Sequence, residues 1–189
     1  MAAAEQLQII TVEEYLRDEA ARETRHEYLV GTVHAMAGAS RQHNRIVRQI
    51  QSHLNGQFGK GPCEAWNSDL KLHIKTSLAE YFYYPDVMVG CDPADNHEYY
   101  LEHPSILFEV LSPSTESIDR REKLLAYQTI PSLEHYVIVA QEERRIEWLR
   151  REGNSWKVSV LTRPEDRLEF PGQGASLTLA EIYDGIEFA

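Results

Sequence analysis

Apolar residues recur every three to four positions in several segments, which is the spacing of a helix with one buried face. The longest of these segments, residues 40–58, begins at the helix-capping residue Ser40. Its predicted buried face consists of Ile46, Val47, Ile50, Leu54 and Phe58. Three shorter segments, residues 11–21, 115–129 and 179–183, are also predicted to be helical. The stretches between these helices follow a different pattern.

Apolar and polar residues alternate in those stretches, as they do in strands with one buried face. Residues 69–74 show this alternation clearly. Residues 105–111 are almost wholly apolar apart from Glu109, which predicts a central strand covered on both faces. Further strands are predicted at residues 26–30, 32–36, 63–66, 86–89, 134–140, 144–150, 156–161 and 168–170. This order predicts one α/β (α+β) domain over residues 1–189, with a mixed β-sheet flanked by helices.

The charge of the chain limits the partners it can have. It contains 19 basic and 30 acidic residues, so its net charge is −11 and phosphate backbones repel it on average. This argues against tight, sequence-independent DNA binding, although a local basic patch can still hold a nucleic acid. The chain starts without a secretory signal, and its apolar runs are too short to span a membrane. We expect a cytoplasmic protein in which Cys63 and Cys91 are reduced thiols.

Two carboxylates interrupt the apolar runs that are expected to form the core. Asp86 directly follows Pro85, and Glu109 stands between large apolar residues. A charge in a core strand is costly unless something compensates it, and a divalent cation such as Mg²⁺ prefers oxygen ligands of this kind. Carboxylates from two adjacent strands, with a backbone carbonyl between them, would supply half of its shell. In the alternative reading, Asp86 caps a turn and Glu109 pairs with an arginine.

Other polar residues could complete such a site. Lys123 shares a helix face with Asp119 and Tyr127 and could orient water or stabilise charge at a phosphate. Its alternative is a surface Asp119–Lys123 pair worth about 0.3–0.5 kcal/mol. A third carboxylate could come from Glu27, and phosphate contacts could come from His43 or Arg45, although each of these residues is more often structural or solvated.

The motifs together resemble a known family, the Uma-type putative restriction endonucleases of the PD-(D/E)XK nuclease superfamily. The similarity runs in order along nearly the whole chain. It rests on Thr11-Val-Glu-Glu-Tyr-Leu, His26-Glu-Tyr-Leu-Val-Gly, Met36-Ala-Gly-Ala-Ser with His43-Asn44, Tyr84-Pro-Asp-Val, Phe108-Glu-Val-Leu-Ser-Pro-Ser-Thr, Asp119-Arg-Arg-Glu-Lys-Leu and Pro131-Ser-Leu-Glu-His-Tyr-Val-Ile-Val. The resemblance implies a restriction-endonuclease-like core in which a mixed sheet lies between helices.

The resemblance also implies roles for individual residues. Asp86 and Glu109 would bind the metal, and the carbonyl of Val110 would join them. The lysine that the superfamily usually has two positions after the second acid is replaced here by Leu111. Lys123 on the following helix would take over its function, as happens in some nucleases of this kind. Glu27 would match the early acidic position of the family and His43 its helix-start histidine.

We therefore predict an endonuclease that uses Mg²⁺ or Mn²⁺ to hydrolyse phosphodiester bonds in DNA. Its predicted catalytic residues are Asp86, Glu109, Lys123 and Glu27, and its predicted substrate contacts are His43, Arg45 and Tyr127. The rival hypothesis is a non-catalytic interaction or regulatory module that keeps the nuclease fold. The negative charge and Leu111 favour the module, whereas Asp86 and the buried Glu109 favour the enzyme. A homodimer would allow both DNA strands to be cut, but nothing in the sequence requires one.

Overall fold

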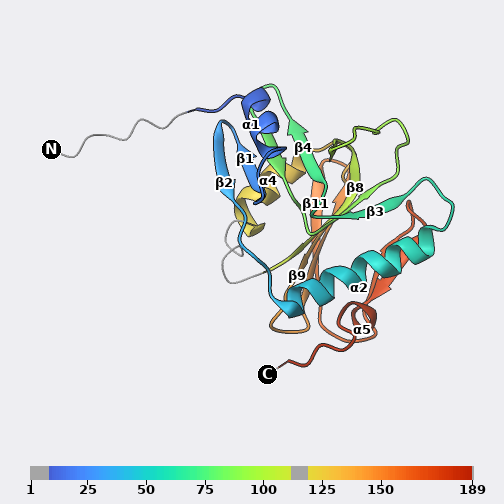
Figure 1. Ribbon diagram of the computed structural model, residues 1–189. Coiled ribbons are helices and arrows are strands. Elements are labelled where there is room, and N and C mark those ends of the chain that lie inside the picture. Colours follow the sequence, from blue (N-terminus) through green and yellow to red (C-terminus); the bar gives the residue numbers. More distant parts are fainter. Residues whose placement is uncertain (1–8, 112–118, 189) are drawn as a thin grey trace.

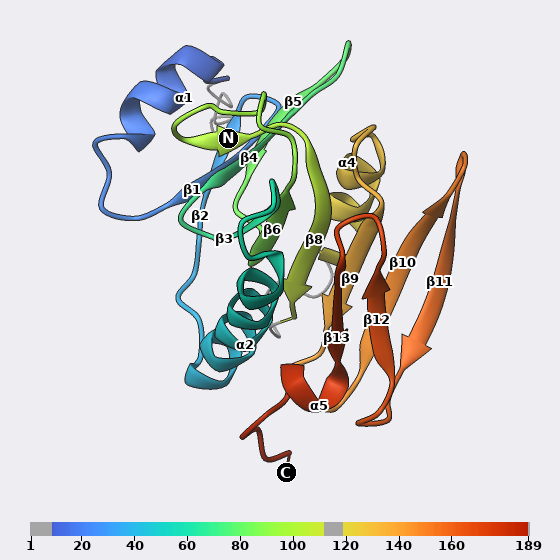
Figure 2. The same ribbon diagram turned by 90° about the vertical axis from the view of Figure 1, so that its right-hand side faces the viewer.

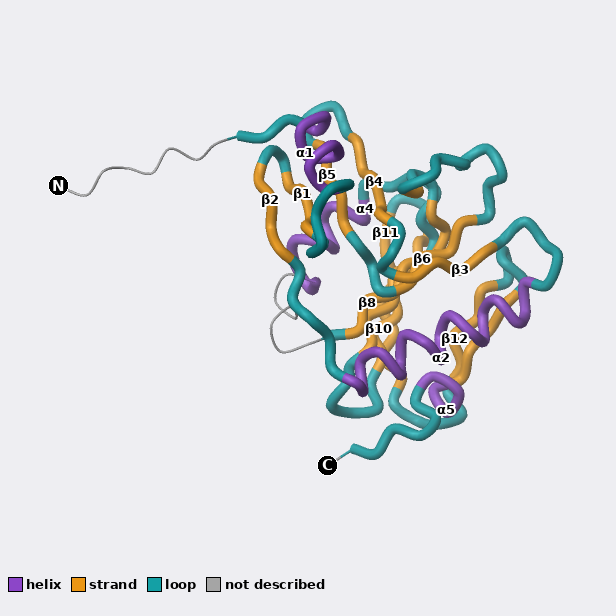
Figure 3. Tube along the Cα trace, in the orientation of Figure 1, coloured by secondary structure: helices purple, strands orange, loops and turns teal. Residues whose placement is uncertain are grey.

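The computed structural model describes residues 9–111 and 119–188, which form two main β-sheets with helices packed around them (Figure 1). Figure 3 distinguishes the strands of these sheets from the helices by colour. This confirms the predicted α+β class with mixed sheets and flanking helices. The single predicted sheet is divided, however, into a five-stranded sheet, a six-stranded sheet and a small two-stranded hairpin.

The six-stranded sheet contains the strand on which the candidate site is built. Its strand order is β11-β10-β9-β8-β6-β3. The bounds are β3 Glu64–Asn67, β6 Val87–Gly90, β8 Pro104–Val110, β9 His135–Val139, β10 Ile146–Glu152 and β11 Ser155–Leu161. β8 pairs antiparallel with β6 and parallel with β9, and all seven of its residues are buried. The prediction of a central strand covered on both faces is confirmed.

The helix α2, Arg41–Phe58, covers one face of this sheet (Figure 2). The Ser40 side chain accepts a hydrogen bond from the His43 backbone N–H and so caps the first turn. Buried helix residues Ile46, Ile50, Leu54 and Phe58 pack against β6 and β8, as their spacing predicts. α2 ends at Gly59, whose φ of +58° suits a residue without a Cβ atom.

The opposite face is covered by the five-stranded sheet and a short helix. The core between them joins Leu72 and Tyr83 to Leu107, Tyr127 and other apolar residues. This second sheet has the order β2-β1-β5-β4-β7. Its strands are β1 His26–Leu29, β2 Thr32–Ala35, β4 Lys71–Lys75, β5 Glu80–Tyr83 and β7 Tyr100–Leu101. The helix on this side is the π-helical turn η1, Asp119–Lys123, continued by α4, Leu124–Gln128.

The remaining elements cover the outside of the two sheets. The helix α1, Val12–Glu19, begins with the capping box of Thr11 and Glu14 and packs its Tyr15 against Tyr28 and Phe82 of the five-stranded sheet. On the far side of the molecule lie the hairpin of β12, Arg167–Phe170, and β13, Ala175–Thr178, and the short helix α5, Leu179–Ile182.

Three strands were not predicted, and one prediction about the cysteines is wrong. The unpredicted strands are β5, β7 and β13. Cys63 and Cys91 form a disulfide between the start of β3 and the end of β6, so they are not reduced thiols. The predicted strand break at Ser112-Pro113-Ser114 and the helix start near Thr115 lie outside the described residues. No helix in the described part of the chain is long and apolar enough to cross a membrane, and the cytoplasmic location stays a prediction.

We expect His135 on β9 to make the protein less stable as the pH falls from about 6.5 to about 4. Burial lowers the pKa of His135 from 6.5 to about 4, partly opposed by the nearby Glu134 carboxylate. In that pH range the unfolded chain binds a proton that the folded chain does not, so acidification favours unfolding. The expected loss is about 2 kcal/mol after allowing for remaining hydration. Urea denaturation at a series of pH values would measure it.

The variant His135→Gln provides the control for this effect. It removes the titrating group but still offers an acceptor to Trp148, whose Nε1 donates to His135 Nδ1 at 3.3 Å. We expect its stability to change less over the same pH range. An equal pH dependence in the variant and the wild type would assign the effect to other groups.

Candidate active site

Glu109 is a buried carboxylate one residue before the end of β8, with only 3% of its surface exposed. Side chains alternate along a strand, so its neighbours Phe108 and Val110 face α2 while Glu109 faces the opposite core. There its Oε1 accepts hydrogen bonds from the Tyr127 hydroxyl at 2.6 Å and from Lys123 Nζ at 3.2 Å. The carboxylate that the sequence pattern singled out therefore has charged and polar partners inside the core.

Lys123 is the buried cation of this cluster, with 6% of its surface exposed. Its Nζ lies 3.2 Å from Glu109 Oε1 and 3.2 Å from Glu27 Oε1, and 5.8 Å from the centre of the Tyr83 ring. It is the last residue of the π-helical turn η1, a wide turn of a kind that is frequent at functional sites. This burial excludes the alternative in which Lys123 belongs to a surface pair.

Tyr127 contacts Glu109 from inside the core, and its side chain does not reach the surface. Its side chain is completely buried, and burial followed by the neighbouring Glu109 charge raises its pKa well above 10. The hydroxyl therefore stays protonated and donates to the Glu109 carboxylate. The predicted role of Tyr127 as a substrate contact does not fit this placement, because a fully buried side chain cannot touch a substrate.

Asp86 lies next to Glu109 in the pairing of two adjacent strands. Val87 pairs with Phe108, so Asp86, one residue earlier, stands across from Glu109 in the antiparallel register. Its Oδ2 accepts the Val110 backbone N–H at 2.7 Å, and its Oδ1 lies 3.0 Å from His43 Nε2. The Asp86 carboxylate thus joins the start of β6 to β8 and to the first turn of α2, and it does not merely cap a turn after Pro85.

Glu27 comes from the other sheet. Its neighbour Tyr28 packs on the outer side with α1, so by alternation Glu27 faces the six-stranded sheet, where Lys123 lies. The site is therefore assembled where the two sheets meet, from β1, β8 and η1. His43 adds a contact from α2 through Asp86.

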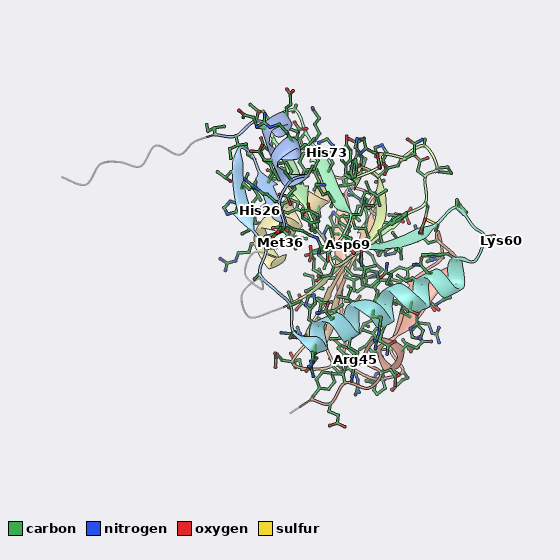
Figure 4. All side chains as sticks on the ribbon, viewed as in Figure 1. His26, Met36, Arg45, Lys60, Asp69 and His73 are labelled. Atoms are coloured by element: carbon green, nitrogen blue, oxygen red, sulfur yellow. A yellow bond between two sulfur atoms is a disulfide. The ribbon has the colours of Figure 1, made fainter. Side chains whose placement is uncertain are left out.

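Arg45 is not part of this cluster. It lies on the side of α2 that faces α5 and the C-terminal segment (Figure 4). Its Nη1 donates to the backbone carbonyl of Gly185. The structure therefore gives no support to the predicted phosphate contact by Arg45, whereas it brings Asp86, Glu109, Lys123, Glu27 and His43 into one connected region.

The oxygen donors of this region determine which metal it could hold. No group of three or more histidine, cysteine, aspartate or glutamate side chains within the described residues is arranged to bind a metal ion. Mg²⁺, however, often uses only one or two carboxylates and keeps several waters. Asp86 and Glu109 are such carboxylates, and the Val110 carbonyl points to the same side of β8 as its N–H, which contacts Asp86. The donor set fits Mg²⁺ or Mn²⁺, which would compete with His43 for Asp86 Oδ1.

Comparison with known proteins places this geometry in context. The model of the Uma2 family, described as putative restriction endonuclease, matches residues 12–180. Two uncharacterized proteins of Synechocystis sp. are each 33% identical to this chain, one over 95% of this chain and 94% of its own length, the other over 86% and 93%. A crystal structure of a putative nuclease belonging to DUF820 from Anabaena variabilis has a similar fold. Its TM-score is 0.73 at 16% sequence identity, and the match covers 92% of this chain and 97% of that one.

Proposed function

Because this chain belongs to the Uma2 family of putative restriction endonucleases, we propose that it is a metal-dependent endonuclease that hydrolyses phosphodiester bonds in DNA. One observation carries the proposal: Glu109, buried in the central strand, is paired with a buried lysine and stands across the strand register from Asp86. Two acids at the ends of adjacent strands, with a lysine from the turn η1 beside them, are a donor set for phosphodiester hydrolysis.

The proposed metal is Mg²⁺ or Mn²⁺, held by Asp86, Glu109 and the Val110 carbonyl. When bound, such an ion lowers the pKa of a coordinated water and neutralises charge at the phosphate. The side chains around it have supporting functions. Tyr127 and Lys123 both donate to Glu109 and keep its carboxylate oriented, and His43 does the same for Asp86.

Lys123 and Glu27 would act together on the charge of the reacting group. The ammonium of Lys123 lies equally close to both glutamates, so it can offset the charge of two neighbouring carboxylates in a site with little water. If a phosphate enters beside Glu109, the same ammonium can stabilise its developing negative charge or hold the attacking water. Glu27 in turn is a second anionic partner of Lys123.

A second candidate is a non-catalytic interaction module, and three observations favour it. Both oxygens of the Asp86 carboxylate already have protein partners, and Leu111 occupies the position at which the superfamily usually has its lysine. The net charge of −11 also weakens attraction to DNA. In this reading the cluster around Glu109 would hold the two sheets together.

Calorimetric titration of Mg²⁺ and Mn²⁺, followed by a plasmid-nicking assay, would separate the two candidates. We expect the wild type to bind the metal and to nick supercoiled plasmid only when metal is present. The variant Asp86→Asn should lose metal affinity and nick at least about 100-fold more slowly, because a neutral amide is a weaker ligand. Asp18→Asn on the surface of α1 is the matched control and should behave as the wild type.

The remaining outcomes also have definite meanings. Metal binding that requires Asp86, without nicking of DNA, would establish the metal site and direct the search to another phosphodiester substrate. Absence of metal binding to the wild type, even with DNA present, would overturn the enzyme proposal in favour of the interaction module.

A further inference from the structure

The strand β11 forms an open edge of the six-stranded sheet. It pairs with β10 on one side, and Figure 2 shows its other side facing away from the molecule. Two apolar side chains of this strand are unusually exposed, Val158 at 55% and Val160 at 47%. A long edge strand with apolar side chains is a template for pairing with another strand.

The backbone groups that face outward can be identified from the hairpin that joins β10 to β11. Glu152 pairs with Ser155 across a two-residue turn, and Arg150 pairs with Lys157 two steps further along. In an antiparallel ladder, hydrogen-bonded pairs alternate with non-bonded ones, and the pair that closes a two-residue turn is bonded. The N–H and C=O groups of Trp156, Val158 and Val160 therefore point away from β10.

Other strand edges of this protein are covered by side chains of α2. The amide of Asn55 contacts both the N–H and the C=O of Ala65 on β3, at 2.8 and 3.0 Å. Gln57 contacts the N–H and C=O of Ser176 on β13 in the same way, at 2.9 and 2.8 Å. Within the described part of the chain, no side chain covers β11 in this manner. The protein thus protects two strand edges and leaves its seven-residue outer strand open.

We propose that β11 pairs antiparallel with β11 of a second copy of this chain, about a two-fold axis at Val158. In this register Val158 meets Val158 of the partner subunit, and Trp156 meets Val160 of the partner subunit. The outward-pointing backbone groups then form hydrogen-bonded pairs, and the apolar side chains form one continuous stripe on a single face of the joined sheet.

The side chains of β11 favour this register over its two neighbours. Lys157 is the only charged residue of β11, and the axis at Val158 places it across from Ser159 of the partner subunit. An axis at Lys157 would place two lysines opposite each other, and like charges in directly opposite positions are destabilising. An axis at Ser159 would place Lys157 across from the apolar Leu161 of the partner subunit.

The dimer should be reversible and sensitive to salt. Pairing along one strand buries less surface than the roughly 1,600 Å² of a standard stable interface, so dissociation on dilution is expected. Each copy carries a net charge of −11, and the two copies therefore repel each other at low ionic strength. Higher salt should strengthen the association. The inference does not depend on the proposed hydrolysis, because association can be measured without any activity.

Cysteine cross-linking tests the register directly. The only native cysteines are joined to each other, so an added cysteine has no native thiol to react with. In the variant Val158→Cys the two added residues would face each other with Cα atoms about 5.5 Å apart, within the range for a disulfide. We expect mild oxidation to give a covalent dimer that reducing agent separates.

Val160→Cys is the matched control, because Val160 is similarly exposed but would lie about 13 Å from its own copy in the partner. It should cross-link at least tenfold less than Val158→Cys. Equal cross-linking of the two variants, or none in either, would overturn the proposal.

In a parallel test by analytical ultracentrifugation, the wild type should dimerise with increasing concentration. The variant Val158→Lys should stay monomeric with an unchanged circular dichroism spectrum. A monomeric wild type at all concentrations would also refute it.

Discussion

Replacing Lys123 with methionine is expected to destabilise the protein by about 3–5 kcal/mol, the range for breaking a buried ion pair. Lys123 is the cation between Glu27 and Glu109, whose side chains are only 15% and 4% exposed. Methionine fills a similar volume but leaves two carboxylates close together in a site with little water. One of them must then take up a proton or remain as an uncompensated charge. Urea denaturation followed by circular dichroism would measure the loss.

Two further variants make this result specific. Lys75→Met removes a lysine that pairs with Glu80 at 3.4 Å but is 66% exposed, and its effect should stay within about 0.5 kcal/mol. In the double variant Lys123→Met with Glu109→Gln, one of the two carboxylates is neutral, so part of the lost stability should return. If Lys123→Met lost as little stability as Lys75→Met, Lys123 would not be the group that compensates the buried charge of Glu109.

The sequence predicted the burial of Glu109 and the pairing of its strand, because the physical reasons for the first are local. A carboxylate between Phe108 and Val110 can be recognised as unusual from the apolar run alone, and the structure places it in a fully buried strand. The adjacency of Asp86 and Glu109 was predicted from two strands joined by a long connection, and the register of β6 and β8 confirms it.

The functions of Tyr127 and Arg45 could not be derived in this way. Both lie on predicted helices, but a helix pattern gives only the face of the helix and not what packs against that face. Tyr127 faces inward because α4 closes the core between the two sheets. Arg45 faces the C-terminal segment, which contacts α2 only in the folded chain. The four-residue spacing of Lys123 and Tyr127 was the available signal that both approach Glu109.

The division into two sheets was missed because a single apolar stretch contributes one strand to each sheet. β5 and β6 are separated only by Tyr84, Pro85 and Asp86, so the stretch from Tyr81 to Gly90 gives no sign that it changes sheets. β7 is two residues long and lies within a polar connection, and β13 is rich in small and hydroxyl side chains. The disulfide was missed for a related reason, since the pairing of β3 with β6 that joins the two cysteines is not visible in their spacing.

Glu109→Gln is expected to reduce metal-dependent nicking about 1,000-fold while the protein stays folded, if the proposed function holds. Glutamine keeps an oxygen that can accept from Tyr127 and Lys123, and Lys123 retains Glu27 as an anionic partner. What it loses is the negative charge that a hard metal ion needs from its ligand. Single-turnover nicking over a range of Mg²⁺ and Mn²⁺ concentrations, together with urea denaturation, would measure both effects.

Comparison with Glu27→Gln then distinguishes a ligand from a residue that only balances charge. If Glu109 binds the metal and Glu27 mainly holds Lys123, raising the metal concentration should restore more activity to Glu109→Gln than to Glu27→Gln. Glu23→Gln, at an exposed position, should leave nicking unchanged. Full activity in Glu109→Gln would separate the buried cluster from catalysis. Since Lys123→Met would still unfold the protein more easily, Glu109 and Lys123 would then serve to join the two sheets.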